Sequence, residues 1–198
     1  MRTITVVENL SLDGVMQAPG REDEDERGGF TYGGWASRML VDDPEVVQTS
    51  LGESGSGSEM LFGRRTYLDL VGHRLSTPDP NPFTAILRTT RKYVVSRTLN
   101  EPLPPPSSTL LAGDAVDAVR TLRADGEGEL VVLGSGDLVR QLAAAGLVDE
   151  YQLTILPVVL GVGTRLFGDT HTELEPIRTQ AFESGAVVAR YRVAGRGR

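Results

Sequence analysis

The 198-residue sequence contains no cysteine, only two histidines and a single tryptophan. Without cysteine, the chain has no disulfides, no thiolate nucleophile and no cysteine-ligated zinc or iron–sulfur centre. His73 and His171 lie far apart in the sequence and form no metal-ligand pattern, so we expect no metal site. The sequence also lacks an apolar run long enough to cross a bilayer, and Glu8 and Asn9 come too early for a secretory signal. These absences predict a cytoplasmic protein.

Basic residues are also scarce, with 20 Lys and Arg against 27 Asp and Glu and a net charge of −7. This balance argues against a general nucleic-acid or membrane-surface binder, which normally carries a basic face. A small anionic ligand stays compatible with it, because a few arginines can act locally. The apolar content of 39% and the length favour one globular domain, residues 1–198, with a core of its own.

Segments with strand and helix character alternate along the chain. Strands are expected at 3–14, 60–63, 91–99, 129–136 and 150–161, and helices at 42–51, 65–73, 114–126 and 137–146. The glycine- or proline-rich stretches 52–59, 76–83 and 101–108 predict loops. The segment 178–193 reads as two strands around Ser184 and Gly185, a hairpin signal. The pattern predicts an α/β fold with a mostly parallel sheet and an antiparallel hairpin at the C-terminal end.

Three predicted strands end in residues suited to a phosphate. The first set is Gly63, Arg64, Arg65 and Thr66, the second is Ser96 and Arg97, and the third is Gly134, Ser135 and Gly136, followed by a helix from Asp137. Ligands of open α/β sheets lie at the carboxyl ends of the strands, where helix N-termini offer free N–H groups. Glycine allows a phosphate close to the backbone, and arginine forks onto phosphate oxygens.

Two of the sets have an ordinary alternative: Arg64 and Arg65 as a solvated surface turn, and the Gly-Ser-Gly stretch as a simple bend. A phosphosugar-binding domain is a further alternative, but it needs one phosphate site rather than three. Three sets together favour a dinucleotide held by its phosphates. The surplus of cations favours NADP over NAD, because a ribose 2′-phosphate needs positive partners. The usual Rossmann arrangement is not present, since the first strand leads into "SLDG" and the glycine pair comes late.

Five stretches in order carry a family resemblance: "SLDGVM", "LFGRRTY", "KYVVSRTL", "VVLGSGDLVRQL" and "VDEYQLTILPVVLGVGTRLF". Together they resemble the dihydrofolate reductase-like family, and most closely the reductase domain of the riboflavin-biosynthesis deaminase–reductase and its stand-alone relatives. The resemblance covers the chain from about residue 3 to residue 193. It implies a sheet of about eight strands flanked by helices, NADPH as cofactor, and a homodimer.

The resemblance also implies roles for individual residues. Arg64, Arg65 and Thr66, after Gly63, would bind the cofactor phosphates, and Ser96 and Arg97 the adenosine 2′-phosphate. The pyrophosphate and nicotinamide side would be wrapped by Gly134, Ser135, Gly136, Asp137 and Leu138, and Asn9 would lie near the nicotinamide.

The substrate side departs from dihydrofolate reductases, which carry a carboxylate on their first long helix. The matching place falls near Val47, and the nearby Asp43 and Glu45 fit helix N-terminal charges better. The pocket is expected to involve Asp13, Trp35 and Thr154, with Asp13 the only, weak, candidate for a proton donor. Each has an alternative: Asp13 as a turn residue, Trp35 as a core residue, and Thr154 as a strand former.

The combined interpretation is an NADPH-dependent reductase of a small pterin-, pyrimidine- or flavin-like heterocycle. The alternative is an NADP-binding sensor or interaction protein without turnover. Residues 21–27 carry five carboxylates, which predict a mobile loop that does not pack, with a lid over the substrate or a solvated insert as its two possible roles.

Overall fold

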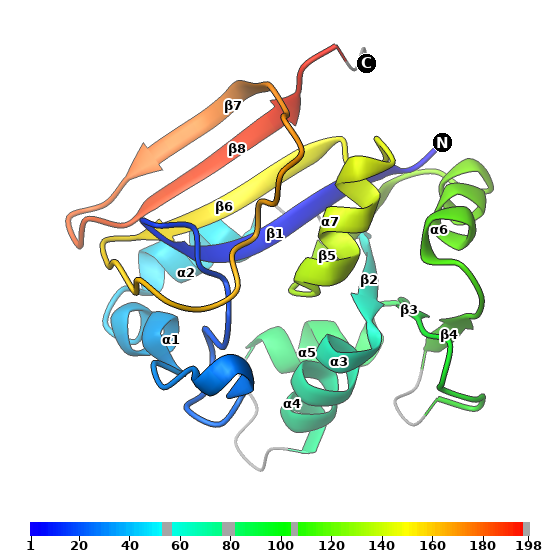
Figure 1. Cartoon of the computed structure of the whole chain (residues 1–198), viewed down its shortest axis with the longest axis horizontal. Coiled ribbons are helices and arrows are strands. Elements are labelled where there is room, and N and C mark those ends of the chain that lie inside the picture. Colours follow the sequence, from blue (N-terminus) through cyan, green and yellow to red (C-terminus); the bar gives the residue numbers. More distant parts are fainter. Residues whose placement is uncertain (53–56, 77–81, 104–106, 196–198) are drawn as a thin grey trace. The chain divides into compact units, whose positions relative to one another are not determined.

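The computed structural model describes residues 1–52, 57–76, 82–103 and 107–195 (Figure 1). Parts of the predicted loops at 52–59, 76–83 and 101–108 lie outside these residues. The strands form one eight-stranded sheet in the order β4-β3-β2-β5-β1-β6-β8-β7. The predicted α/β fold of mixed, mostly parallel character is confirmed, and so is the antiparallel C-terminal hairpin of β7 and β8.

The elements have the following bounds. The strands are β1 (Thr3–Ser11), β2 (Glu59–Gly63), β3 (Lys92–Val95), β4 (Ser108–Leu111), β5 (Glu129–Leu133), β6 (Glu150–Leu156), β7 (Leu174–Ala181) and β8 (Val187–Val193). The helices are α1 (Trp35–Leu40), α2 (Pro44–Gly52), α3 (Arg64–Thr66), α4 (Gly72–Ser76), α5 (Pro82–Thr89), α6 (Ala115–Ala124) and α7 (Gly136–Ala144). A short 3₁₀ turn η1 (Arg27–Gly29) and a π-helical segment η2 (Tyr67–Val71) complete the described structure.

The chain divides into two compact units, each assembled from separate segments. Unit 1 comprises residues 1–5 and 55–147, and unit 2 comprises residues 6–54 and 148–198. Whether they act as the single domain expected from the sequence stays a prediction.

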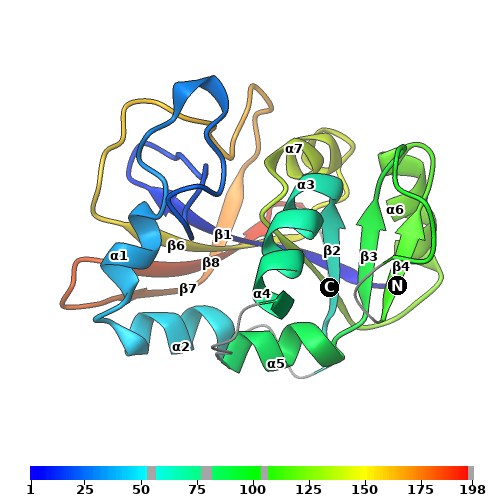
Figure 2. The same ribbon diagram turned by 90° about the horizontal axis from the view of Figure 1, so that it is seen from below.

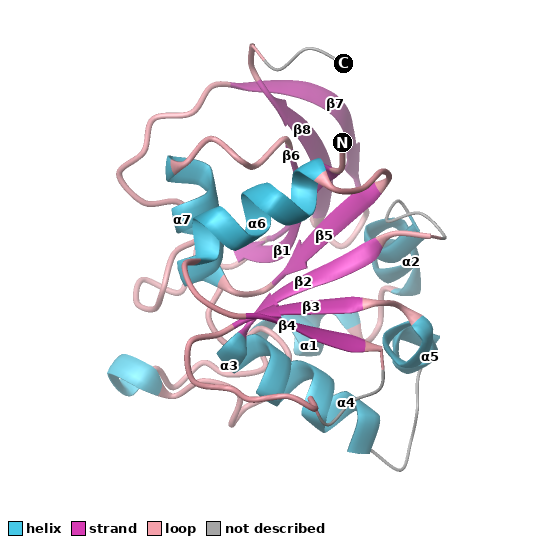
Figure 3. Cartoon of the chain, turned by 90° about the vertical axis from the view of Figure 1, so that its right-hand side faces the viewer, coloured by secondary structure: helices cyan, strands magenta, loops and turns pink. Residues whose placement is uncertain are grey.

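In unit 1, β2 pairs in parallel with both β3 and β5, and β3 pairs in parallel with β4. Figure 2 shows β2, β3 and β4 pointing the same way, with β2 leading directly into α3. Side chains alternate along β2, so Met60 and Phe62 share one face and pack in a cluster with Tyr67, Val71 and Leu87. That face carries α3, η2, α4 and α5, while α6 and α7 lie on the other side of these strands (Figure 3). The carboxyl ends of the four parallel strands β2, β3, β4 and β5 therefore lie at the same edge of the sheet.

In unit 2, β8 lies between β6 and β7 and pairs antiparallel with both. The core of this unit gathers residues from far apart in the chain: Val15, Ala18, Phe30, Trp35, Ala36, Val46, Leu156, Ala186 and Val188. The segment around the first turn, the helices α1 and α2 and the C-terminal strands are thus joined by one apolar cluster.

Several sequence predictions need correction. The strand β4 follows the predicted loop at 101–108 and was missed, since four residues are too few to show alternation. The helices α1 and α5 were also missed. The strand expected at 150–161 ends at Leu156, because Pro157 lacks the donor that another sheet bond needs. Asp43, by contrast, caps α2 as its place before Pro44 suggests, accepting the Val46 N–H at 3.2 Å.

No helix in the described part of the chain is both long enough and apolar enough to cross a membrane.

Candidate functional site

The turns that follow β2 and β5 are joined by a hydrogen bond within unit 1. The Gly63 N–H donates to Ser135 Oγ at 2.9 Å, and Ser135 Oγ donates to the Leu133 carbonyl oxygen at 3.2 Å. Ser135 has a positive φ of 65°, which is uncommon for a residue with a side chain. The Ser135 side chain thus links the two turns by hydrogen bonds, a role that the sequence did not indicate.

Gly134 lies close to Thr66 of the other turn. Its φ is +55°, and a Cβ atom built there would lie 2.8 Å from Thr66 Cγ2. Such a distance is too short for a carbon–carbon contact, so Gly134 and Thr66 fit together only because Gly134 has no side chain. The structure therefore brings the first and third predicted phosphate sets together.

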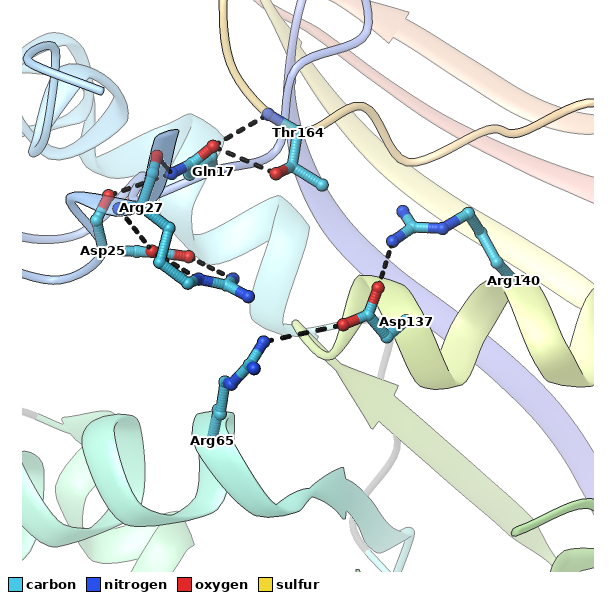
Figure 4. A network of polar contacts seen from close by, with 7 residues as sticks. All are labelled: Gln17, Asp25, Arg27, Arg65, Asp137, Arg140 and Thr164. Carbon is cyan, nitrogen blue, oxygen red and sulfur yellow. Dashed lines mark hydrogen bonds and ion pairs between the residues drawn. The ribbon is translucent and has the colours of Figure 1, made fainter. Parts of the chain in front are cut away.

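The charged side chains at this edge form a short network, drawn in Figure 4. Arg65 Nη1 lies 3.7 Å from Asp137 Oδ2, and Asp137 also pairs with Arg140 (Figure 4). Arg64, Arg65 and Asp137 are exposed, and Asp137 lies in the first turn of α7, where a negative charge is favourable. An anion at this edge would compete with Asp137 for Arg65.

The second set follows β3, the strand next to β2. Ser96 is buried, and its Oγ accepts the N–H groups of Thr98 and Leu99 at 3.1 and 3.0 Å. The Ser96 hydroxyl therefore shapes the turn, and Arg97 is the exposed cation of this set. Leu138, the last residue of the third set, has a buried side chain, so only its backbone is suited to a polar ligand.

The remaining predicted residues belong to unit 2. Asn9 lies on β1 and is half-buried. Asp13 receives the Leu160 and Gly161 N–H groups at 3.1 and 2.9 Å and the Ser11 hydroxyl at 2.7 Å. These hydrogen bonds, that from Ser11 first, lower the pKa of Asp13 from 3.8 to about 2. Asp13 is therefore ionised at neutral pH and holds a turn, which favours its turn alternative over a proton donor.

Trp35 is 3% exposed and lies in the core cluster of unit 2. Its indole N–H donates to the Gln17 carbonyl oxygen at 2.8 Å, which satisfies its one polar group. This is the core alternative that the sequence left open, and nothing in the arrangement supports stacking on a ligand.

Thr154 is also buried, and its hydroxyl lies 2.7 Å from the Ser50 hydroxyl of α2. Two residues earlier on the same strand, Gln152 Nε2 donates to the Ser50 carbonyl oxygen at 2.6 Å. Thr154 and Gln152 share a face of β6 because side chains alternate along a strand, and that face meets α2.

Sequence reasoning missed Glu8. It lies on β1 among Ile4, Val6 and Leu10, on the face with their period of two, and is 6% exposed. Its Oε1 is buried and makes no hydrogen bond with any described residue. Burial, with a smaller contribution from the Glu24 charge, raises the pKa of Glu8 well above 4.5. A single acid within an apolar alternating run was the available signal.

The acidic segment 21–27 is held by hydrogen bonds although none of its residues is buried, and its mobility stays a prediction. Glu24 Oε2 accepts the N–H groups of Gly20 and Arg21, and Gln17 Nε2 donates to the carbonyl oxygens of Asp25 and Arg27. The Gln17 carbonyl end accepts from the Thr164 N–H and hydroxyl at 2.8 and 3.0 Å (Figure 4). Gln17 thus fixes the segment against the chain after β6, and a lid role for it stays a prediction.

Among the described residues, no group of three or more acids and histidines is arranged to hold a metal ion.

The fold and the strand-end turns define the class of protein. The chain superposes over 98% of its length on a putative riboflavin biosynthesis protein from Shewanella sp. PV-4, with a TM-score of 0.63, 20% identity and 99% of that chain covered. A pyrimidine reductase-like protein from Corynebacterium diphtheriae gives a TM-score of 0.60 at 14% identity, covering 98% of this chain and 93% of that one. The dihydrofolate reductase of Enterococcus faecalis complexed with NADP(H) and RAB-propyl gives a TM-score of 0.60 at 16% identity, covering 97% of this chain and 96% of that one. The fold is therefore dihydrofolate reductase-like, as the resemblance implied.

The family is narrower than the fold. Residues 2–188 match the RibD C-terminal domain, and the chain belongs to that family. It is also 31% identical over 134 residues to the uncharacterized protein YyaP of Bacillus subtilis (strain 168), a match that covers 65% of this chain and 70% of YyaP.

Proposed function

We propose that the protein is an NADPH-dependent reductase of a small pterin-, pyrimidine- or flavin-like heterocycle. The observation that carries the proposal is the joined pair of turns after β2 and β5, with exposed arginines beside the N-terminus of α7. Free N–H groups and cations at the ends of parallel strands suit the phosphates of a dinucleotide. The bound cofactor would supply the hydride, and the protein supplies binding and orientation.

The residues present fit that cofactor. Gly134 leaves no Cβ at the turn, the N-terminus of α7 faces the same turn, and Arg64 and Arg97 are exposed cations on neighbouring strand ends. Arg97 is assigned to the 2′-phosphate, and Arg64, Arg65 and Thr66 to the other phosphates. That Asn9 lies near the nicotinamide stays a prediction from the family resemblance.

Three relatives support the choice of ligands. One was solved with NADP(H), one is described as pyrimidine reductase-like, and one as a putative riboflavin biosynthesis protein. All three descriptions concern flat nitrogen heterocycles or the cofactor proposed here.

The test is the comparison of NADPH with NADH by titration calorimetry. NADPH should bind about tenfold to a hundredfold more tightly, since a charged hydrogen bond contributes about 1.5–3 kcal/mol. Arg97→Ala should lower NADPH affinity to the level of NADH, whereas Arg88→Ala, which removes an exposed arginine on α5, should leave both unchanged. Equal dissociation constants for the two cofactors in the unaltered protein would contradict the proposal.

The second candidate is a sensor that binds NADP without turnover. It is favoured by the ionised state of Asp13, which removes the proton donor that the sequence offered. The two candidates differ in one measurement. A reductase consumes NADPH absorbance in the presence of a pterin, pyrimidine or flavin, and a sensor does not.

We further propose a homodimer that acts in the cytoplasm on a small molecule, without nucleic-acid or membrane partners. Exposed apolar side chains in unit 2, at Val159, Val162, Phe167 and Ile177, support self-association. Light scattering after size exclusion tests the oligomeric state.

A further inference from the structure

Glu8 is a buried acid, and no hydrogen bond from the described residues offsets the free-energy cost of burying its Oε1. It is 6% exposed, it lies on β1 in unit 2, and its Oε1 has no hydrogen-bond partner among the described residues. A buried acceptor without a donor costs free energy, and folded proteins contain few of them. Such a group needs an explanation, and a donor supplied by a bound ligand is one.

A second buried acid in the same unit shows what a structural carboxylate looks like. Glu150, on β6, is 8% exposed and accepts from Arg190 Nε at 2.8 Å and from Arg192 Nη2 at 3.0 Å. Its charge is fully paired across the sheet. Glu8 is buried to a similar extent but has no such partner. The two acids therefore differ in that only the Glu150 carboxylate is paired within the unit.

Gln152 carries another unpartnered acceptor on β6, the strand next to β1 in the sheet. Its Nε2 donates to the Ser50 carbonyl oxygen, which fixes the amide orientation and leaves Oε1 as the buried acceptor. Neighbouring strands of unit 2 therefore each present one buried oxygen that lacks a donor.

We infer that Glu8, with Gln152 on the neighbouring strand, is the recognition point for the N–H-bearing edge of a lactam-type heterocycle, such as a pyrimidinone or pteridinone. This inference rests on the proposed function and narrows its substrate class. Burial disfavours the charged form of Glu8 and raises its pKa, and a carboxyl in its neutral form offers both an O–H donor and a C=O acceptor. A lactam presents the complementary pair, one N–H and one C=O side by side.

Replacement of Glu8 is expected to raise the stability of the free protein and to weaken binding of a lactam. Replacing Glu8 with leucine removes the unpartnered acceptor and fills the site with apolar atoms, so the free protein should melt at a higher temperature. The same change removes the donor and acceptor that a lactam needs. A residue kept for structure would instead lose stability when it is replaced.

The experiment uses the full chain and lumazine, a fluorescent pteridine dione with two ring N–H groups, as the probe. Its derivative methylated at both nitrogens keeps the shape and lacks the donors. Glu8→Leu should weaken lumazine binding at least about tenfold, whereas Glu8→Gln, which keeps a donor and an acceptor, should stay within about threefold. The matched control Glu45→Gln alters an exposed carboxylate on α2 in the same unit and should change neither binding nor melting.

The inference is overturned if Glu8→Leu binds lumazine like the unaltered protein or melts at a lower temperature. It is also overturned if the unaltered protein does not bind lumazine or binds the methylated derivative equally well. NADPH affinity, measured on the same preparations, is judged separately. If NADPH still binds but lumazine binding does not depend on Glu8, this inference alone is contradicted. If the protein binds NADH as tightly as NADPH, the proposed cofactor alone is contradicted.

Discussion

Among single residues, Asp13 is the one whose ionisation couples most directly to folding at acid pH. Its folded pKa of about 2 is below the ordinary 3.8, so it contributes stability above pH 3.8 that is lost as the pH falls toward 2. Asp13→Asn should lower the melting temperature at pH 7 and flatten the loss between these two pH values. Melting curves from pH 2 to 7 for both proteins check this, and parallel curves would show that Asp13 does not carry the coupling.

Gly134 and Thr66 offer a second test, on packing alone. Gly134→Ala forces a Cβ to 2.8 Å from Thr66 Cγ2 at a positive φ and should destabilise the protein by about 1–3 kcal/mol. Thr66→Ser removes that methyl group, so the double variant should recover part of the loss. Chemical denaturation of the four proteins in this cycle measures the coupling. Strict additivity of the two changes would mean that the turns do not touch as described.

At the level of the element, the C-terminal end of α5 depends on a residue of the next strand. Lys92 is fully buried, and its ammonium donates to the carbonyl oxygens of Leu87 and Thr90 at 2.6 and 2.7 Å. These carbonyls lie where a helix presents unsatisfied acceptors and partial negative charge.

Lys92→Met should therefore destabilise the protein by about 2 kcal/mol, because two carbonyls lose their donor. Arg91→Met, one residue earlier, removes an exposed ion pair with Glu59 of 3.7 Å and should cost about 0–1 kcal/mol. Urea denaturation of both variants gives the comparison. Similar losses for the two would contradict a capping role for the buried ammonium.

The sequence predicted elements where periodicity and end signals agreed, and failed where they did not. The helix α6 was recognised because apolar residues recur at helical spacing and Gly126 follows its end. The structure adds a cap, since Asp114 accepts the Val116 and Asp117 N–H groups. The strand β4 was missed because its four residues follow prolines and take their strand character from pairing with β3. Local propensity says little about an element whose stability comes from its neighbour.

The same contrast holds for the candidate site. The glycines and arginines at the strand ends were found because strand, glycine and helix start occur in order. Glu8 was missed because burial depends on the packing of unit 2, and one acid in an apolar strand looks like a surface residue. Asp13 was judged by its type, although the donors to its carboxylate come from both the local turn and the distant residues 160, 161 and 165.

For the whole molecule, Glu8 and Asp13 set opposite limits on the pH range of greatest stability. The folded pKa of Glu8 is raised above 4.5, so the free-energy cost of burying it is smallest below pH 4.5 and grows as the pH rises toward the folded pKa. Asp13 loses its contribution below pH 3.8. The combined contribution of these two groups to stability is therefore greatest at acidic pH, between about 4 and 5.

Glu8→Gln should remove the upper limit and leave the protein more nearly equally stable up to pH 8. Unfolding free energies from denaturant titrations at one ionic strength check this prediction. The Glu24 charge, the other acid that acts on Glu8, stays in place in both proteins. A variant that keeps the full slope above pH 4.5 would assign that slope to another group.

The order of segments in the two units has a consequence for the newly made chain. Unit 1 is completed by residue 147, whereas unit 2 waits for its last strands. On the ribosome, β7 emerges before β8, yet β8 is its partner in the sheet and also the partner of β6. Unit 2 buries apolar residues from positions 6–54 of the chain. Their core is incomplete until translation reaches Val193. In the nascent protein unit 2 therefore stays incompletely folded after unit 1 can fold. A chaperone that binds exposed apolar segments is expected to bind unit 2 during this interval.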